Sequence, residues 1–120
     1  MELRILAADD EKNMRDLYSR IFSSGRYELT LAESVAEATG LMSSGAYDLL
    51  ISDLVLPDGD GLELVRRFRE QGRGRVILIT ASMEDEDLAK LGEREGVLKA
   101  YGKPFSVRDL LQVVDGLSAP

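Results

Sequence analysis

The feature that most constrains the fold is an alternation, repeated five times along the 120-residue chain, of a short apolar run and a longer helix-like stretch. The runs have the length of strands, and the last is the weakest of them: 3–8, 27–32, 48–52, 76–80 and 97–101. The run 48–52 is apolar through its centre, which is typical of a strand buried on both faces of a sheet. Such alternation implies parallel strands joined by helical crossovers, with helices on both faces of one sheet. The sequence therefore predicts a three-layer α/β fold.

Start and stop residues support the helical stretches, which span 11–23, 34–44, 60–71, 84–95 and 106–117. Ser34 followed three residues later by Glu37 is a capping-box pattern, and Asp60 with Glu63 is a looser version of it. A chain of this length buries roughly two thirds of the surface that its unfolded form exposes, which is enough for one domain. We expect that domain to cover residues 1–117, with 118–120 as a tail or the start of a linker.

The composition excludes several kinds of chemistry. The sequence has no cysteine and no histidine, which removes thiolate nucleophiles, imidazole bases and metal sites built from those residues. Its 15 basic and 22 acidic residues give a net charge of −7, so direct binding to nucleic acid is not expected. No apolar run approaches the ~20 residues that span a bilayer, and the first residues do not resemble a signal peptide. We therefore expect a cytoplasmic domain that makes no membrane contact.

Reactive side chains follow the predicted strands at the point where each strand ends. Asp9 and Asp10 follow the first strand, Asp53 follows the third, Thr80 ends the fourth, and Lys103 comes after the fifth. Open parallel sheets build their sites beyond the carboxyl ends of the strands. The sequence therefore predicts one site that contains all five side chains.

Each of these residues also has a purely structural interpretation. Asp10 is a suitable N-cap for the first helix, and Asp53 suits a turn. Thr80 fits a strand end, and Lys103 fits a solvated loop. Taken together, three carboxylates, a hydroxyl and an ammonium at one edge of a sheet favour a functional site.

The predicted group of side chains has the parts needed for phosphoryl transfer. Clustered carboxylates favour a hard divalent cation, and Mg²⁺ takes oxygen ligands that include phosphate oxygens. A carboxylate can itself act as the nucleophile toward phosphorus and form an aspartyl phosphate. The cation and a lysine then balance the charge that develops on the transferred group.

Over nearly its whole length the chain resembles the receiver domain of bacterial response regulators. The matching segments are 5–11, 47–64, 79–81 and 103–106, and the block that follows Asp53 with Pro57 and Gly61 is the most specific of them. The resemblance implies a flavodoxin-like (βα)5 three-layer sandwich with a five-stranded parallel sheet in the order 2-1-3-4-5.

The resemblance also implies a role for each matching residue. Asp53 would be the phosphoacceptor, with Thr80 and Lys103 contacting the phosphoryl group. Asp9, Asp10, Asp53 and the backbone carbonyl of Val55 would hold Mg²⁺. The Lys103–Pro104 peptide bond would be cis, which proline permits, and Pro57 and Gly61 would shape the turn after Asp53.

One position departs from the family. The usual switch residue is an aromatic three positions before the lysine, where this chain has Ala100, and Tyr101 comes one residue later. In a regular strand this offset turns Tyr101 to the opposite face, toward the core or a helix. The alternative is a bulge at Gly102 that redirects Tyr101 toward Thr80.

Two surface features bear on signalling. Val55, two residues after Asp53, offers no polar side chain to position attacking water, so we hypothesise a long-lived phosphoryl group. The predicted fourth helix carries many acidic residues, which are typical of a solvated face. In the family, the face formed by the fourth helix, fifth strand and fifth helix usually mediates output.

The resulting hypothesis is a regulatory domain that takes its phosphoryl group from a histidine kinase or a phosphotransfer protein. It promotes its own phosphorylation and dephosphorylation but is not an enzyme with an external substrate, and it acts as a monomer or as a phosphorylation-dependent dimer. The alternative is a phosphorylation-independent interaction module on the same scaffold, supported by Ala100. A phosphatase with an aspartate nucleophile is disfavoured because Asp-x-Asp is missing after the first strand, and no P-loop is present.

Overall fold

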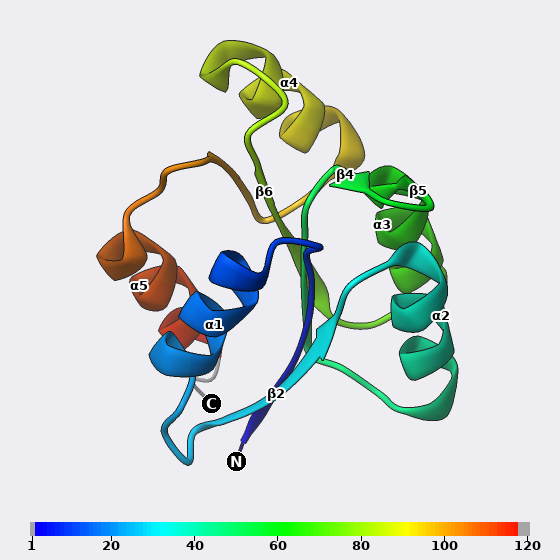
Figure 1. Ribbon diagram of the computed structural model, residues 1–120, viewed down its shortest axis with the longest axis vertical. Helices are drawn as coiled ribbons and strands as arrows, with labels where there is room; N and C mark the ends of the chain where they lie inside the picture. Colours follow the sequence, from blue (N-terminus) through cyan, green and yellow to red (C-terminus); the bar gives the residue numbers. More distant parts are fainter. Residues whose placement is uncertain (1, 118–120) are drawn as a thin grey trace.

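A twisted sheet of parallel strands lies between two layers of helices in the computed structural model, which describes residues 2–117 (Figure 1). The elements follow in the order β1 Leu3–Ala8, α1 Lys12–Ile21, β2 Tyr27–Ala32, α2 Val35–Ser44, β3 Leu49–Ser52, β4 Val55–Leu56, β5 Gly59–Asp60, α3 Gly61–Glu70, β6 Arg75–Thr80, α4 Asp85–Glu95, β7 Lys99–Gly102 and α5 Val107–Leu117. The predicted tail, 118–120, lies outside the described residues. No helix within residues 2–117 is long and apolar enough to cross a membrane.

The five-stranded sheet has the order β2-β1-β3-β6-β7, and every neighbouring pair in it is parallel. This order confirms the predicted 2-1-3-4-5 order, because β4 and β5 form a separate two-stranded antiparallel hairpin. The hairpin was not predicted. Strands of two residues carry no hydrophobic periodicity from which to predict them.

The core is divided by the sheet into two clusters of buried side chains. Alternate residues of β1 enter different clusters: Ile5 and Ala7 pack with α1 and α5, whereas Leu6 and Ala8 pack with α2, α3 and α4. Figure 1 shows α1 and α5 together on one side of the sheet, and α2 and α3 on the other. The central strand β3 is buried throughout, as its continuous apolar run predicts.

The helix boundaries follow local capping. The Ser34 hydroxyl accepts a hydrogen bond from the backbone N–H of Glu37 at 3.1 Å, at the predicted capping position. At the end of α4, Gly96 has a φ of +70° and stops the helix in the left-handed conformation. The Val97 N–H then returns to the carbonyl of Gly92, so β7 begins at Lys99 and not at Val97 as predicted.

Candidate functional site

The site lies at the carboxyl edge of the sheet, where backbone hydrogen bonds between neighbouring strands continue past the strand ends. The Asp9 N–H donates to the carbonyl of Ala32, and the Asp53 N–H donates to the carbonyl of Ala8, both at 3.0 Å. The Lys103 N–H donates to the carbonyl of Thr80 at 2.9 Å. The parallel ladder therefore holds Asp9, Asp53, Thr80 and Lys103 beside one another.

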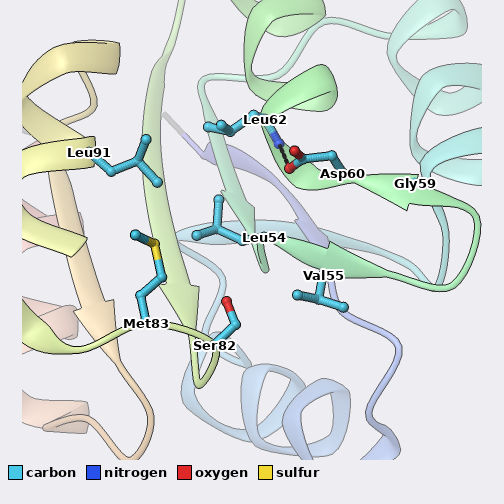
Figure 2. Close-up of a pocket in the computed structure, with 8 residues that line it drawn as sticks. All are labelled: Leu54, Val55, Gly59, Asp60, Leu62, Ser82, Met83 and Leu91. Atoms are coloured by element: carbon cyan, nitrogen blue, oxygen red, sulfur yellow. Dashed lines mark hydrogen bonds between the residues drawn. The ribbon is translucent and has the colours of Figure 1, made fainter. Parts of the chain in front are cut away.

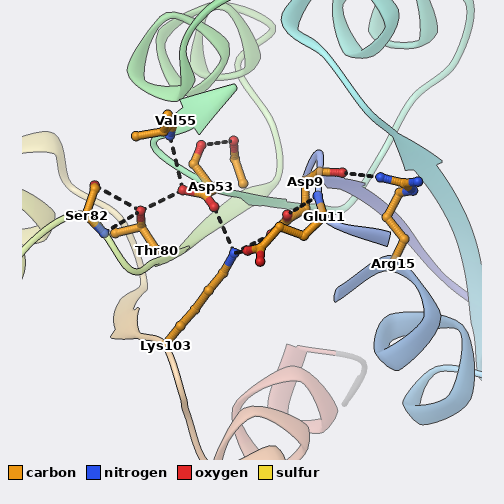
Figure 3. Close-up of polar contacts among 9 residues, drawn as sticks. Asp9, Glu11, Arg15, Asp53, Val55, Thr80, Ser82 and Lys103 are labelled. Atoms are coloured by element: carbon orange, nitrogen blue, oxygen red, sulfur yellow. Dashed lines mark hydrogen bonds and ion pairs between the residues drawn. The ribbon is translucent and has the colours of Figure 1, made fainter. Parts of the chain in front are cut away.

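The Lys103 ammonium is the centre of the polar network (Figure 3). Its Nζ lies 2.9 Å from Asp9 Oδ2 and 2.8 Å from Asp53 Oδ2, and it also bonds to Glu11 Oε1. The side chains of Asp9, Asp53 and Lys103 are largely buried, whereas that of Glu11 is half exposed. Ion pairs shielded from water in this way are screened little by salt.

The other carboxylate oxygen of Asp53 has two further donors. The Thr80 hydroxyl donates to Asp53 Oδ1 at 2.6 Å, and the Val55 N–H donates to the same oxygen at 3.1 Å. Both oxygens of Asp53 thus accept hydrogen bonds, one from the Lys103 ammonium and the other from the Thr80 hydroxyl and the Val55 N–H.

Burial and charge act in opposite directions on the ionisable groups. Desolvation is the largest influence on Asp9 and raises its pKa, although the N–H of Glu11 and the Lys103 ammonium oppose that shift. Desolvation alone would lower the pKa of Lys103, but its hydrogen bonds to Asp53, Glu11 and Asp9 outweigh it and raise that pKa. Lys103 is therefore held as an ammonium among carboxylates.

The carboxylates fit a divalent cation. One oxygen from each of Asp9, Glu11 and Asp53 lies within 4.8 Å of the others. Three carboxylates and one ammonium leave a formal charge of −2, which a divalent ion would neutralise. Hard oxygen donors with open access to solvent are the ligands that Mg²⁺ prefers in proteins. An open cavity of about 310 Å³ borders this group, lined by Asp10, Glu11, Asp53, Val55, Thr80, Ala81 and Ser82.

The close carboxylate group contains Glu11 in addition to Asp9 and Asp53, two of the predicted ligands. Asp10 is exposed and lines the cavity, but its carboxylate is not part of the close group formed by Asp9, Glu11 and Asp53. Asp10 is not the N-cap of α1 either, since Glu11 occupies that position. Glu11 lies in the matching segment 5–11, but the sequence predicts no role for it. Only its contact with Lys103, 92 positions later, brings it into the site.

The turn after Asp53 is shaped by a close approach of two backbone segments. A Cβ atom on Gly61 would lie 1.9 Å from the carbonyl oxygen of Asp53, so only glycine fits there. The Gly61 N–H donates to the carbonyl of Leu54 at 2.8 Å, which holds the start of α3 against the site. Pro57 lies in the turn of the β4–β5 hairpin. Its neighbour Asp58 accepts hydrogen bonds from the first backbone N–H groups of α2, which lower its pKa.

Tyr101 points away from the site. β7 pairs with β6 residue for residue, with Tyr101 beside Ile79, so no bulge redirects the ring. The ring packs among the α1 and α5 side chains, 6.1 Å from the ring of Phe105, whereas Ala100 packs on the α4 side. Burial, and to a lesser extent the carboxylate of Asp109, raises the pKa of Tyr101. The Lys103–Pro104 peptide bond is cis.

Ser82 is a site residue that the sequence did not suggest. Its hydroxyl lies 3.0 Å from the Thr80 hydroxyl, and its backbone N–H donates to Thr80 Oγ1 at 3.3 Å (Figure 3). No strand or motif ends at Ser82, so its sequence position carries no signal. A serine two residues beyond the end of a strand can be assigned to the site only when the path of the chain after that strand is known.

Comparison with known proteins gives a consistent result. Residues 5–115 match the family model described as the response regulator receiver domain. The chain is 33% identical, over 97% of its length, to "Transcriptional regulatory protein ResD" of Bacillus subtilis (strain 168). It is 32% identical, over 92% of its length, to "Response regulator MprA" of Mycobacterium bovis (strain BCG / Pasteur 1173P2). The chain spans 48% of each of these relatives, about half of their length.

Solved structures of other response regulator proteins superpose on this chain over almost its full length. The "Francisella response regulator 1452 receiver domain" superposes with a TM-score of 0.85 at 28% identity, covering 98% of this chain and 97% of that one. "Chemotaxis response regulator CheY4 of Vibrio cholerae" superposes with a TM-score of 0.83 at 25% identity, covering 98% and 99%. The acidic cluster, the sheet order and these similarities converge on one assignment. The chain belongs to the receiver domain family of response regulators in two-component signalling.

Proposed function

We propose that this receiver domain accepts a phosphoryl group on Asp53 from a phosphohistidine of a kinase or phosphotransfer protein, in a Mg²⁺-dependent reaction. The observation that carries the proposal is the set of contacts around the Asp53 carboxylate. One of its oxygens accepts from the Thr80 hydroxyl, the other from the Lys103 ammonium, and an open cavity borders it. Since these 120 residues contain no histidine, the phosphohistidine must lie outside this domain.

The chemistry assigns a task to each side chain. An Asp53 oxygen attacks phosphorus while the phosphorus–nitrogen bond of the donor breaks, and the electron pair of that bond returns to the imidazole. Lys103 and Thr80 would donate to the oxygens of the transferred group, where negative charge develops. Asp9, Glu11 and Asp53 would hold Mg²⁺, and Asp10 and the Val55 carbonyl remain predicted ligands. When bound, the ion neutralises phosphoryl charge.

A second candidate function rests on Ala100. Because that residue has no ring to couple with Thr80, the fold could serve as an interaction module that does not respond to phosphorylation. The complete acidic cluster with Lys103 and Thr80 favours the first function, because a module of the second kind has no use for a buried charged group.

The partners follow from the same proposal. The relatives are response regulators about twice as long as this chain, so the domain would act on an output region or partner. We propose α4, β7 and α5 as the output face, in a monomer or a phosphorylation-dependent dimer. The domain would promote only its own phosphorylation and dephosphorylation, in the cytoplasm where the phosphodonor is made.

The experiment that separates the two functions is a titration with beryllofluoride, a phosphoryl mimic, in excess Mg²⁺, followed by two-dimensional NMR. We expect saturable shifts centred on Asp53, Thr80 and the neighbouring loops, with no such shifts in Asp53→Asn. Acetyl phosphate with Mg²⁺ should add one phosphoryl group to the wild-type chain, as measured by mass spectrometry. A folded wild-type protein that binds no beryllofluoride and gains no phosphoryl group would support the interaction module instead.

A further inference from the structure

The direction of the hydrogen bonds at Thr80 follows from counting protons. A threonine hydroxyl has one proton to donate and two lone pairs that accept. The Thr80 hydroxyl donates its one proton in the 2.6 Å hydrogen bond to Asp53 Oδ1. In the 3.0 Å contact between the two hydroxyls, Ser82 must therefore be the donor. With the Ser82 N–H as the second donor, Thr80 Oγ1 makes its full set of three hydrogen bonds.

We propose that Ser82 is a positioning residue that holds the Thr80 hydroxyl toward Asp53 and carries the state of Asp53 to helix α4. The inference rests on the proposed function, because it concerns how phosphorylation at Asp53 is sensed. The two residues, named here the Thr80–Ser82 hydroxyl pair, form a chain of aligned donors that ends on the carboxylate. Aligned hydroxyls polarise one another, so a change at one end alters the other.

The segment after Ser82 connects this pair to α4 within two residues. Met83 follows directly, and its side chain packs against the core cluster that contains Leu88 and Leu91 of α4. Figure 2 shows Ser82 and Met83 on one loop, with the Met83 and Leu91 side chains close to each other. Glu84 comes next and is the N-cap of α4, where its carbonyl accepts from the Leu88 N–H at 2.9 Å. A movement of Ser82 therefore displaces the start of α4.

Position 100 has no ring, and the loop from Ser82 to Glu84 is the covalent connection between Thr80 and α4. Ala100 packs under α4, where a Cβ atom built on Gly92 would lie 3.1 Å from the Ala100 Cβ. Helix and strand are thus too close for a large side chain to move between them. Tyr101 is on the other face of the sheet, where it packs among the α1 and α5 side chains and not under α4. The coupling of Thr80 to α4 inferred here runs through the backbone from Ser82 to Glu84.

The test uses Ser82→Ala, which removes the hydroxyl and keeps the backbone N–H. The probe is beryllofluoride in excess Mg²⁺, and the readouts are the methyl NMR signals of Thr80 and of Leu88 and Leu91. We expect the apparent affinity to fall about two- to tenfold, the range for one net hydrogen bond. We also expect the Thr80 methyl signal of the unliganded protein to move, and the Leu88 and Leu91 signals to respond less at saturation.

Two further variants complete the experiment. Ser82→Thr keeps a hydroxyl and should restore the affinity and the α4 response. Ser43→Ala removes an exposed hydroxyl of α2 that donates to the Gly40 carbonyl, far from the site in the sequence, so it should behave as wild type. Wild-type affinity and wild-type methyl responses in Ser82→Ala would overturn the inference, as would a Ser82→Thr protein no better than Ser82→Ala. If the wild type itself binds no beryllofluoride, the proposed function fails, and the Thr80 signal of the unliganded variants still tests the hydroxyl pair.

Discussion

At the scale of single residues, the site is a balance between one buried ammonium and three carboxylates. Lys103 bonds to Asp9, Glu11 and Asp53 together, and its burial is tolerable only because those partners replace its hydration. The same ammonium sits among the oxygens that would hold a cation. Lys103 therefore stabilises the metal-free protein and at the same time opposes the binding of a divalent ion.

Substitution of Lys103 tests this balance. In Lys103→Met the formal charge of the group changes from −2 to −3, so Mg²⁺ should bind more tightly, by on the order of tenfold. Beryllofluoride binding should be lost in the same variant, because a donor to the phosphoryl mimic is missing. Isothermal titration calorimetry with each ligand measures both effects. Weaker Mg²⁺ binding in a folded Lys103→Met protein would contradict this assignment of Lys103.

Val55 gives a second prediction at this scale. Its backbone N–H holds Asp53 Oδ1, while its side chain is 58% exposed and lines the cavity beside Asp53. An apolar side chain there cannot position a water molecule for attack on the phosphoryl group. We expect Val55→Asn to shorten the phosphoryl lifetime about two- to tenfold, the gain from one new hydrogen bond.

The lifetime is measured as the decay of the phosphorylated form after the phosphodonor is removed. Val55→Ala is the matched control, since it shortens the side chain without adding a polar group, and it should leave the lifetime near that of wild type. A wild-type lifetime of seconds that Val55→Asn leaves unchanged would refute the hypothesis.

At the scale of elements, the site depends on how closely the start of α3 approaches the end of β3. Gly61 permits that approach, because any side chain there would overlap the Asp53 carbonyl. Overpacking of this kind forces backbone shifts, and here the shift moves the peptide of the proposed phosphoacceptor. The stability of α3 and the geometry of Asp53 are therefore linked through one glycine.

Gly61→Ala should lower the free energy of unfolding by about 1–3 kcal/mol or more, as overpacked sites do. Gly40→Ala is the matched control: Gly40 lies inside α2 with nothing within 4 Å of an added Cβ. There alanine should stabilise the protein by about 0.5–1 kcal/mol through helix propensity. Urea unfolding followed by circular dichroism measures both, and equal effects of the two substitutions would contradict the close-approach argument.

The elements also show how far sequence reasoning extends. The central strands were predictable because a strand buried on both faces reads as a continuous apolar run. The hairpin β4–β5 and the start of β7 were not, since hydrogen bonds at their ends decide them and not side-chain periodicity. The proximity of Asp9, Asp53, Thr80 and Lys103 was predictable because each ends or follows a strand. Glu11 and Ser82 were missed because the turns after β1 and β6 bring them to Lys103 and to the Thr80 hydroxyl, and the sequence pattern does not predict those contacts.

At the scale of the whole molecule, three tyrosines pack in the layer of α1 and α5, where their ionisation is opposed. Desolvation raises the pKa of Tyr18, Tyr27 and Tyr101 above the ordinary value of 10.0, and carboxylates strengthen the effect. Hydrogen bonds raise the pKa of Lys103 above 10.5. All four groups lie in the layer of α1 and α5 or where that layer meets the site. Their raised pKa values make the stability of this part of the molecule depend on pH in the alkaline range.

The sign of the pH dependence follows from proton binding. Above about pH 10 the unfolded chain releases protons from these groups while the folded chain retains them, so stability falls as pH rises. Each retained proton contributes a slope of about 1.4 kcal/mol per pH unit. We expect urea midpoints to be level from pH 8 to about pH 9.5 and to decline steeply beyond, with phenolate absorbance appearing together with unfolding. Tyr18→Phe, which removes a fully buried hydroxyl, should flatten that decline. Phenolate absorbance that develops fully in the folded protein before any loss of structure would show that these tyrosines are open to solvent, against the packing described here.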